Sequence, residues 1–372
     1  MSNQTPLIVV IMLTVLACFL PFIPVGSVNL YISECIIYSA MPFLIFKRFR
    51  INWDIFVSYY LLIVVGLFHG IINNDVLTAI IPIRMFALFY ATFILIQQLN
   101  NNTCQSAFKK ALTVICLVYT FYIINTVFGL ISGRVSVLEF LYNYELGRIK
   151  AFYENGTTSV VIGALLSLLF TIVLCSNNID NRRLFLVTLF ILGVFTASRA
   201  NILANVTSLV AFHLMSKPNF STRWFCGSVA VILVIIASLY IIMLKIILAG
   251  VQIDGSASTR IKYWLVAINS ANSMFDVIFG HGFSERVLYA KFNISFFESF
   301  FVNLYMQAGL IGLFVGTYLI NRIVLIYRLG ARCNFTILSG LLLGNLVGGA
   351  NLFSIFVLPF MLLGLSYLRT ER

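Results

Sequence analysis

Long apolar runs constrain this chain more than any motif does, because they recur along its whole length. Runs of roughly 17 to 25 apolar residues have the length that a helix needs to cross about 30 Å of hydrocarbon. The chain is 61% hydrophobic and only 10% charged, which excludes a water-soluble globule with a polar surface. We therefore predict an all-α polytopic membrane protein that forms a single transmembrane domain over residues 1–372, with about twelve spans, two of them short. The predicted spans are 7–23, 28–46, 53–72, 76–98, 111–131, 158–175, 184–198, 201–215, 225–247, 299–320, 334–349 and 352–368.

The basic residues predict which way the chain crosses the membrane. The 24 Lys and Arg residues outnumber the 12 acids, and most of the cations lie in short segments between apolar runs, where topology explains them better than nucleic-acid binding does. Lys47, Arg48 and Arg50 place the end of the second span in the cytoplasm. Alternation from there puts both termini in the cytoplasm. It leaves two polar outer loops, at 132–157 and 248–298.

Several function classes lack their sequence signals. The seven cysteines show no metal-ligand spacing, and no Gly-rich phosphate loop is present, so we expect neither a metal nor another cofactor. The first run lacks a basic segment before it and a small-residue cleavage site, so we interpret it as a retained helix rather than a signal peptide. Matching broken helices in two halves, the mark of many secondary transporters, are also missing.

The loop 248–298 contains a predicted amphipathic helix. Ser258 can cap it, and apolar residues such as Trp264 and Ile268 follow at helical spacing. Arg260 and Lys262 lie near its start, where free N–H groups and cationic side chains would together favour a phosphate. The alternative is a plain interfacial helix with solvated cations.

Two further arginines interrupt apolar sequence. Arg199 lies in a break between two apolar runs, where we predict that the chain turns back at the outer surface. It is a functional candidate, or else an arginine that extends to lipid phosphates. Arg84 lies within a predicted span, where it either pairs with Glu34 or reaches a lipid-borne diphosphate.

Glu298 and His281 are the remaining candidates in the large loop. Glu298 lies where the loop enters a span, and partial desolvation there would raise its pKa toward that of a general base. Alternatively, it only complements the dipole of the following helix. His281 lies in a tight turn between two glycines and is either functional or structural, whereas His69 and His213 stand alone in apolar runs and are expected to be structural.

The first outer loop has the composition of a sugar-binding segment. Arg148, Phe152, Glu154 and Asn155 combine an aromatic ring with hydrogen-bonding groups just before a span, which suits the ring faces and hydroxyl groups of a sugar. The same composition is also ordinary for a loop at a membrane surface.

Taken together, these residues resemble the bacterial O-antigen polymerase and O-antigen ligase superfamily. Arg148, Phe152 and Glu154-Asn155 before a span are similar to the first outer-loop motif of that family. Ser198-Arg199 resembles its Ser-Arg-Gly turn, with Ala200 in the glycine position.

The large loop carries the rest of the resemblance. Arg260 with Trp264, followed by Gly280-His281-Gly282, is similar to the arginine helix and Gly-x-Gly of the family. Glu298-Ser299, then nine residues and Gly309, resembles the ligase pattern, but Glu298 takes the position of its histidine.

The resemblance implies a GT-C-like fold and a glycosyltransferase without metal or nucleotide sugar. It places the protein in the bacterial inner membrane with a periplasmic active site, where donor and acceptor glycans are linked to undecaprenyl diphosphate. Candidate protein partners are a chain-length regulator and a flippase. The catalytic residues would be Arg199 and Arg260 at the diphosphate and Glu298 as the base. The supporting residues that we expect to bind substrate are Arg84, Arg148, Phe152, Glu154, Asn155, Lys262, Trp264 and His281.

A polymerase is the first expectation, because a ligase should retain the histidine that Glu298 replaces. An O-antigen ligase that transfers polymer to lipid A core is the enzymatic alternative. A flippase or transporter of lipid-linked sugars is the alternative from another class, and it would need charges along a path through the membrane.

Overall fold

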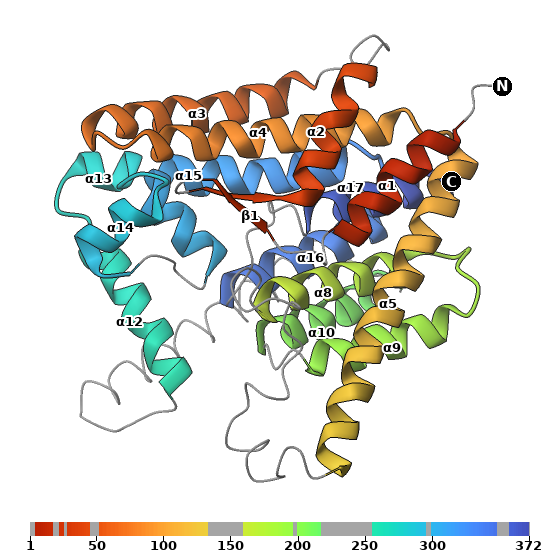
Figure 1. Ribbon diagram of the computed structural model, residues 1–372. Coiled ribbons are helices and arrows are strands. Elements are labelled where there is room, and N and C mark those ends of the chain that lie inside the picture. The colour runs from red at the N-terminus through yellow and green to blue at the C-terminus, as the bar shows by residue number, and fades with distance from the viewer. Residues whose placement is uncertain are drawn as a thin grey trace.

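The computed structural model describes residues 4–17, 22–25, 28–44, 52–132, 159–195, 199–216, 255–294, 299–347 and 357–371. These parts of the chain are helical apart from loops and one short two-stranded ribbon (Figure 1). The N-terminal elements are α1 (Thr5–Ala17), β1 (Phe22–Val25), β2 (Val28–Tyr31), α2 (Ile32–Leu44), α3 (Trp53–Ile72), α4 (Val76–Gln97) and α5 (Asn101–Ile131). Then come α8 (Ser159–Cys175), α9 (Arg182–Phe195), α10 (Arg199–Leu214), α12 (Gly255–Asn269), α13 (Met274–Phe279), α14 (Glu285–Phe292), α15 (Phe300–Leu325), α16 (Ala331–Val347) and α17 (Leu358–Thr370).

Four of the described helices are long and apolar enough to cross a membrane. They are α3, α4, the first 24 residues of α5 and α15, and shorter apolar helices include α1 and the larger parts of α8 and α10. These helices indicate a membrane protein. The total of twelve spans stays a prediction, and the predicted span 225–247 lies outside the described residues.

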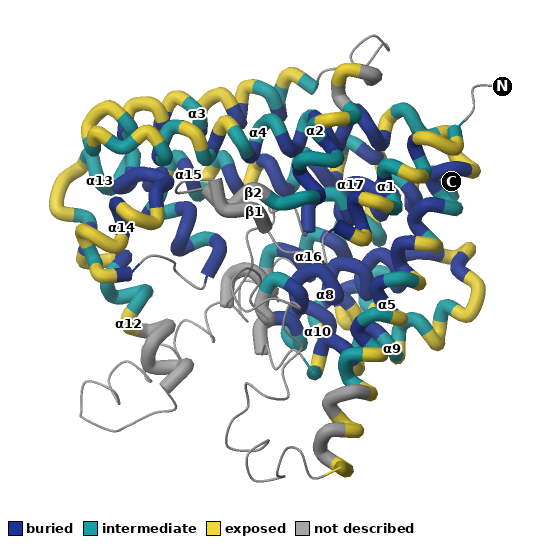
Figure 2. The backbone as a smooth tube through the Cα atoms, in the orientation of Figure 1, coloured by how far each residue is buried: buried dark blue, intermediate teal, exposed yellow. Residues whose placement is uncertain are grey.

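The outer face of α3 shows why such helices suit a bilayer. Large apolar side chains on this face are exposed, from Trp53 at 66% to Ile71 at 81% (Figure 2). A continuous apolar face of this kind is rare on a protein surrounded by water. Contact with lipid accounts for it.

The centre of the molecule is formed by α8 and α17. Both helices are apolar around their circumference and almost completely buried, as Figure 2 shows. They pack against each other, and α17 also contacts α4 and α5. A helix that is apolar on all sides is expected in such a position.

Several element boundaries differ from the sequence predictions. Residues 22–25 and 28–31 pair as antiparallel strands instead of continuing the predicted helices 7–23 and 28–46, since β-branched and aromatic residues beside prolines favour extended structure. Helix α5 begins ten residues before the predicted span, at Asn101, and includes Lys109 and Lys110. Lysine is a good helix former, so a helix can continue beyond its apolar part. Helix α15 extends to Leu325, five residues beyond the predicted end.

The ends of the helices form two opposite regions. The start of α1 and the end of α17 lie at one end of the molecule, whereas α12, α13 and α14 lie at the other (Figure 1). At the first end, Lys109 Nζ lies 3.1 Å from Asp180 Oδ2, and Glu371 accepts a 3.0 Å hydrogen bond from the Asn177 backbone nitrogen. Arg332 stacks 3.5 Å from the centre of the Phe212 ring. This arrangement is consistent with the predicted topology, although the side that faces the cytoplasm stays a prediction.

Candidate functional site

The Gly280–Gly282 turn, which we call the GHG turn, is the best-defined part of the candidate site. Gly280 and Gly282 have φ angles of 73° and 111°, which side chains with a Cβ atom rarely adopt. The sequence prediction of a tight turn around His281 is therefore confirmed. The turn connects α13 with α14, beside α15.

Helix α15 is broken where the GHG turn meets it. Ala308 and Gly309 leave the helical conformation, so the carbonyl groups directly before the break lose their usual partners within the helix. Instead, the backbone nitrogen of His281 donates to the Met306 carbonyl at 2.8 Å, and that of Gly282 donates to the Gln307 carbonyl at 3.0 Å. The GHG turn thus satisfies the carbonyls that the break leaves open.

This junction requires glycine on both sides. A Cβ atom on Gly280 would lie 2.5 Å from the Gly309 nitrogen, and a Cβ atom on Gly309 would collide with the backbone of Ile278. Gly309 also has a φ of 61°. Two glycines that the sequence offered only as parts of separate motifs are therefore in direct contact.

The end of α3 holds the GHG turn from the other side. Nε2 of His69 donates to the Phe279 carbonyl at 2.9 Å, and Nδ2 of Asn73 donates to the His281 carbonyl at 3.2 Å. His69 is buried, and its ring lies 5.8 Å from that of Phe275 on α13. These contacts agree with the expectation that His69 has a structural role. Sequence analysis gave no signal for its partner, which lies 210 positions further along the chain.

His281 itself is buried beside a carboxylate. Its Nδ1 atom lies 3.4 Å from Oδ1 of Asp276, and Oδ2 of Asp276 accepts a 2.7 Å hydrogen bond from Ser273. Burial lowers the pKa of His281, the charge of Asp276 raises it, and the charge of Lys291 lowers it further. The net effect favours the neutral imidazole. His281 is therefore a buried, neutral side chain rather than an exposed cation.

Helix α12 packs against the first half of α15. Its Ala267 joins Val302 and Met306 in a small apolar cluster that also includes Leu288 of α14, and Trp264 packs against this cluster. Lys262 is exposed. The helix begins at Gly255, so Ser258 lies inside it rather than at its cap, and Arg260 belongs to its second turn. The predicted anion site at the helix start is wrong in this detail, because the helix extends further toward the N-terminus than its apolar stripe does.

The ion pair between Arg84 and Glu34, one of the two alternatives for this arginine, is present. Nε of Arg84 donates to Glu34 Oε1 at 2.9 Å, and a second bond joins Nη2 to Oε2. The glutamate side chain is 3% exposed and that of Arg84 is 26% exposed. The pair connects α4 with α2.

The other predicted site residues are described only in part. Arg199 begins α10, and three residues separate it from the end of α9, which agrees with the predicted break. The side chains of Arg199 and Arg260 lie outside the described part of the structure. Glu298 also lies outside the described residues, directly before Ser299, whose side chain caps α15. The remaining residues outside the description are Arg148, Phe152, Glu154 and Asn155.

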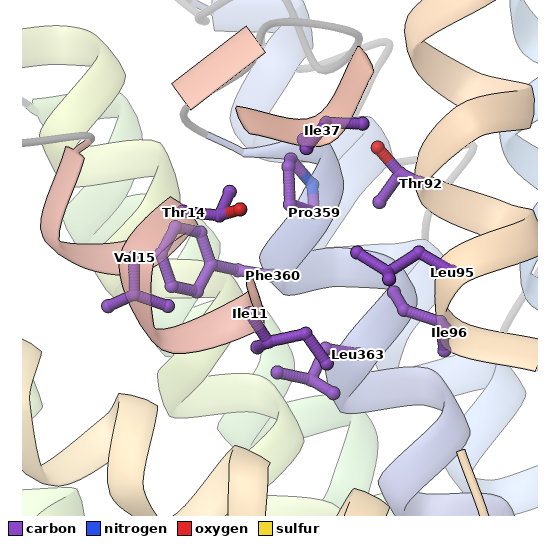
Figure 3. A pocket seen from close by; sticks show the side chains of 10 residues that line it. All are labelled: Ile11, Thr14, Val15, Ile37, Thr92, Leu95, Ile96, Pro359, Phe360 and Leu363. Carbon is purple, nitrogen blue, oxygen red and sulfur yellow. The ribbon is translucent and has the colours of Figure 1, made fainter. Parts of the chain in front are cut away.

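The hollows among the described elements include a groove and a small pocket. A groove of about 470 Å³ runs between α12 and α15 beside the candidate site. A pocket of only about 20 Å³, between α1, α2, α4 and α17, is lined mainly by apolar side chains such as Ile37 and Phe360 (Figure 3). The pocket is large enough for about one water molecule and cannot hold a lipid or a sugar.

Comparison with known proteins adds no family assignment, since neither a protein-family model nor a curated protein matches the chain. Within the described ranges, no three His, Cys, Asp or Glu side chains converge as metal ligands would.

Proposed function

We propose that the chain is an O-antigen polymerase, a GT-C-like membrane glycosyltransferase that joins undecaprenyl-diphosphate-linked repeat units at the periplasmic face. The observation that carries the proposal is the packing of α12 on the first half of α15. Helix α12 bears Arg260 and Lys262, and α15 begins two residues after Glu298. The packing holds the helix that carries Arg260 against the helix that follows Glu298 in the sequence.

The chemistry needs few protein groups. A diphosphate is already a good leaving group, so the main requirement is cationic side chains that bind it and stabilise the developing charge. Arg260 and Arg199 take this role, and Arg199 has the further advantage of the N–H groups at the start of α10. Glu298 acts as the base that accepts the proton of the attacking hydroxyl.

The GHG turn contributes through geometry. It fixes the break in α15 and is held by the end of α3, so the start of α15 has a defined position relative to α3. A rigid support of this kind is what a catalytic base requires, because small displacements of reacting groups reduce rates strongly.

A flippase would require a polar path through the membrane. Two polar contacts of α10 are neutral and join it to α8: Ser208 Oγ lies 2.9 Å from Thr171 Oγ1, and the backbone carbonyl of Asn201 accepts a hydrogen bond from Ser167. Such contacts are typical of packing between membrane helices. They favour the enzyme over the transporter.

Reconstitution of the purified protein with a lipid-diphosphate-linked repeat unit tests the proposal. The wild type should lengthen the glycan without other proteins, and Arg260→Ala should lose at least about a hundredfold in rate, as expected for removal of a group that stabilises transition-state charge. Modification of lipid A core alone would instead identify a ligase. Unchanged elongation by Arg260→Ala would remove α12 from the site.

A further inference from the structure

Cys175 and Cys333 form a pair of thiols at the ends of two helices that pack together. Both are free cysteines; Cys175 is the last residue of α8, and Cys333 is the third residue of α16. Their side chains are hydrogen-bonded to each other, and Sγ of Cys333 lies 3.8 Å from the backbone oxygen of Cys175. Two thiols that are 158 positions apart in the sequence are therefore in direct contact.

Cationic side chains surround the pair. Nε of Arg182 donates to the Val173 carbonyl at 3.1 Å, which holds this guanidinium group at the end of α8. Arg332 directly precedes Cys333 in the first turn of α16. Both arginines are close enough to interact with a charge on Cys175. Positive groups beside a cysteine stabilise its thiolate, which is the nucleophile in thiol–disulfide exchange.

The two thiols differ in accessibility. Cys175 is only 6% exposed, whereas Cys333 is partly exposed. Cys333 also lies in the first turn of α16, where unpaired backbone N–H groups favour negative charge, while burial of Cys175 disfavours charge on its sulfur. A reagent from water therefore meets Cys333 first, and Cys175 is placed to attack the product.

We infer that Cys175 and Cys333 are a redox-sensitive dithiol, which small disulfides of the glutathione type oxidise to a disulfide bond between α8 and α16. The thiolate of Cys333 attacks one sulfur atom of the small disulfide, forms a mixed disulfide and releases a first small thiol. The sulfur of Cys175 then attacks that of Cys333 and releases a second small thiol. Two protein thiols are oxidised, the small disulfide is reduced to two thiols, and the protons of the protein thiols pass to these products.

The position of the pair relates its state to the compartment that it faces. The α8–α9 connection, which follows Cys175 directly, belongs to the end that we predict to be cytoplasmic, where small thiols keep cysteines reduced. A rise in the proportion of small disulfides would close the bond and tie α16 covalently to α8. Both cysteines lie at helix ends, where the backbone can adjust to the sulfur separation of about 2 Å that a disulfide requires. The inference does not depend on the polymerase proposal.

Peptide mapping tests the pair directly. The purified full-length protein in phosphatidylcholine nanodiscs would be incubated with oxidised glutathione, and its peptides would be analysed by mass spectrometry without reduction. We expect a cross-linked peptide that contains Cys175 and Cys333 and that is lost after treatment with dithiothreitol. Free thiols at both positions, or glutathione on Cys333 without the cross-link, would overturn the inference.

Single variants separate the two steps of the exchange. Cys175→Ser should lose the cross-link and retain glutathione on Cys333, because no second thiol is left to displace it. Cys333→Ser should also lose the cross-link and leave Cys175 as a free thiol. Cys35→Ser is the matched control, because Cys35 is partly exposed like Cys333, and it should leave the cross-link unchanged. A cross-link that joins Cys35 to either of the two cysteines would contradict the pairing.

Discussion

Gly309 lies where α15 breaks, with a φ of 61°, a ψ of −151° and the backbone of Ile278 against its α-carbon. Only glycine adopts this conformation readily. We expect Gly309→Ala to lower the free energy of unfolding by about 3 kcal/mol, from backbone strain and overpacking together. Denaturant unfolding of the detergent-solubilised protein measures the change.

Gly193→Ala serves as the control for that substitution. Its new Cβ atom would meet only the side-chain nitrogen of Asn205, at 3.1 Å. Alanine is also a better helix former than glycine, by about 1 kcal/mol, and Gly193 lies inside α9. Its stability should stay within about 1 kcal/mol of the wild type. Similar losses in both variants would contradict a special role for the junction at Gly309.

His281 predicts a pH dependence of stability. Burial lowers its folded pKa below the ordinary value of 6.5, so between the folded pKa and 6.5 the unfolded chain binds more protons than the folded chain. The stability of the fold should therefore fall as the pH decreases through this window. Above about pH 6.5 the contribution of His281 to stability should be complete. Thermal unfolding from pH 8 to pH 5 would show a declining midpoint, and His281→Gln should flatten the decline.

The exposed His213 provides the comparison for this titration. His213→Gln should leave the acid decline as it is in the wild type. An unchanged decline in His281→Gln would contradict the assignment of this pH dependence to His281.

At the scale of elements, apolar length predicts helices well where the chain only has to cross the hydrocarbon. The predicted runs 53–72 and 76–98 correspond almost residue for residue to α3 and α4. Length alone failed at β1 and β2, because an apolar run does not show whether Phe22 or Val28 is helical or extended. It also could not show the break in α15, which depends on a turn that lies about 27 residues earlier in the sequence.

The ion pair between α2 and α4 should stabilise the packing of these helices only while both charges are present. Arg84→Met would leave Glu34 buried without its partner, and we expect a loss of about 3 kcal/mol. The double variant with Glu34→Gln should lose less than the two single variants together. A double-mutant cycle by chemical unfolding should give a coupling energy of about 1–3 kcal/mol.

Lys109 and Asp180 form the exposed comparison pair, with side chains 39% and 90% accessible. Their coupling should stay below about 1 kcal/mol, as is usual for surface ion pairs. Equal coupling in the two cycles would show that burial adds nothing to the pair of Arg84 and Glu34.

At the scale of the whole molecule, the candidate site depends on contacts that no local pattern contains. His69 and Phe279, or Gly280 and Gly309, are distant in sequence and meet only because α3, α13 and α15 pack together. The residue types at the site could be selected from the sequence, since charges and glycines are conspicuous in apolar surroundings. Their partners could not, because helix packing depends on shape complementarity over entire helix faces.

The arrangement of helix ends leads to a prediction about membrane topology. Asp180, 90% exposed, lies in the α8–α9 connection, and Lys262 is exposed on α12 at the opposite end of the molecule. In a cysteine-free background, we expect Lys262→Cys to react with a membrane-impermeant maleimide in intact spheroplasts. Asp180→Cys should react only after lysis, because the basic loops retain its end of the molecule in the cytoplasm. The inverse result would reverse the orientation, and labelling of both positions from outside would contradict the placement of the two ends across the membrane.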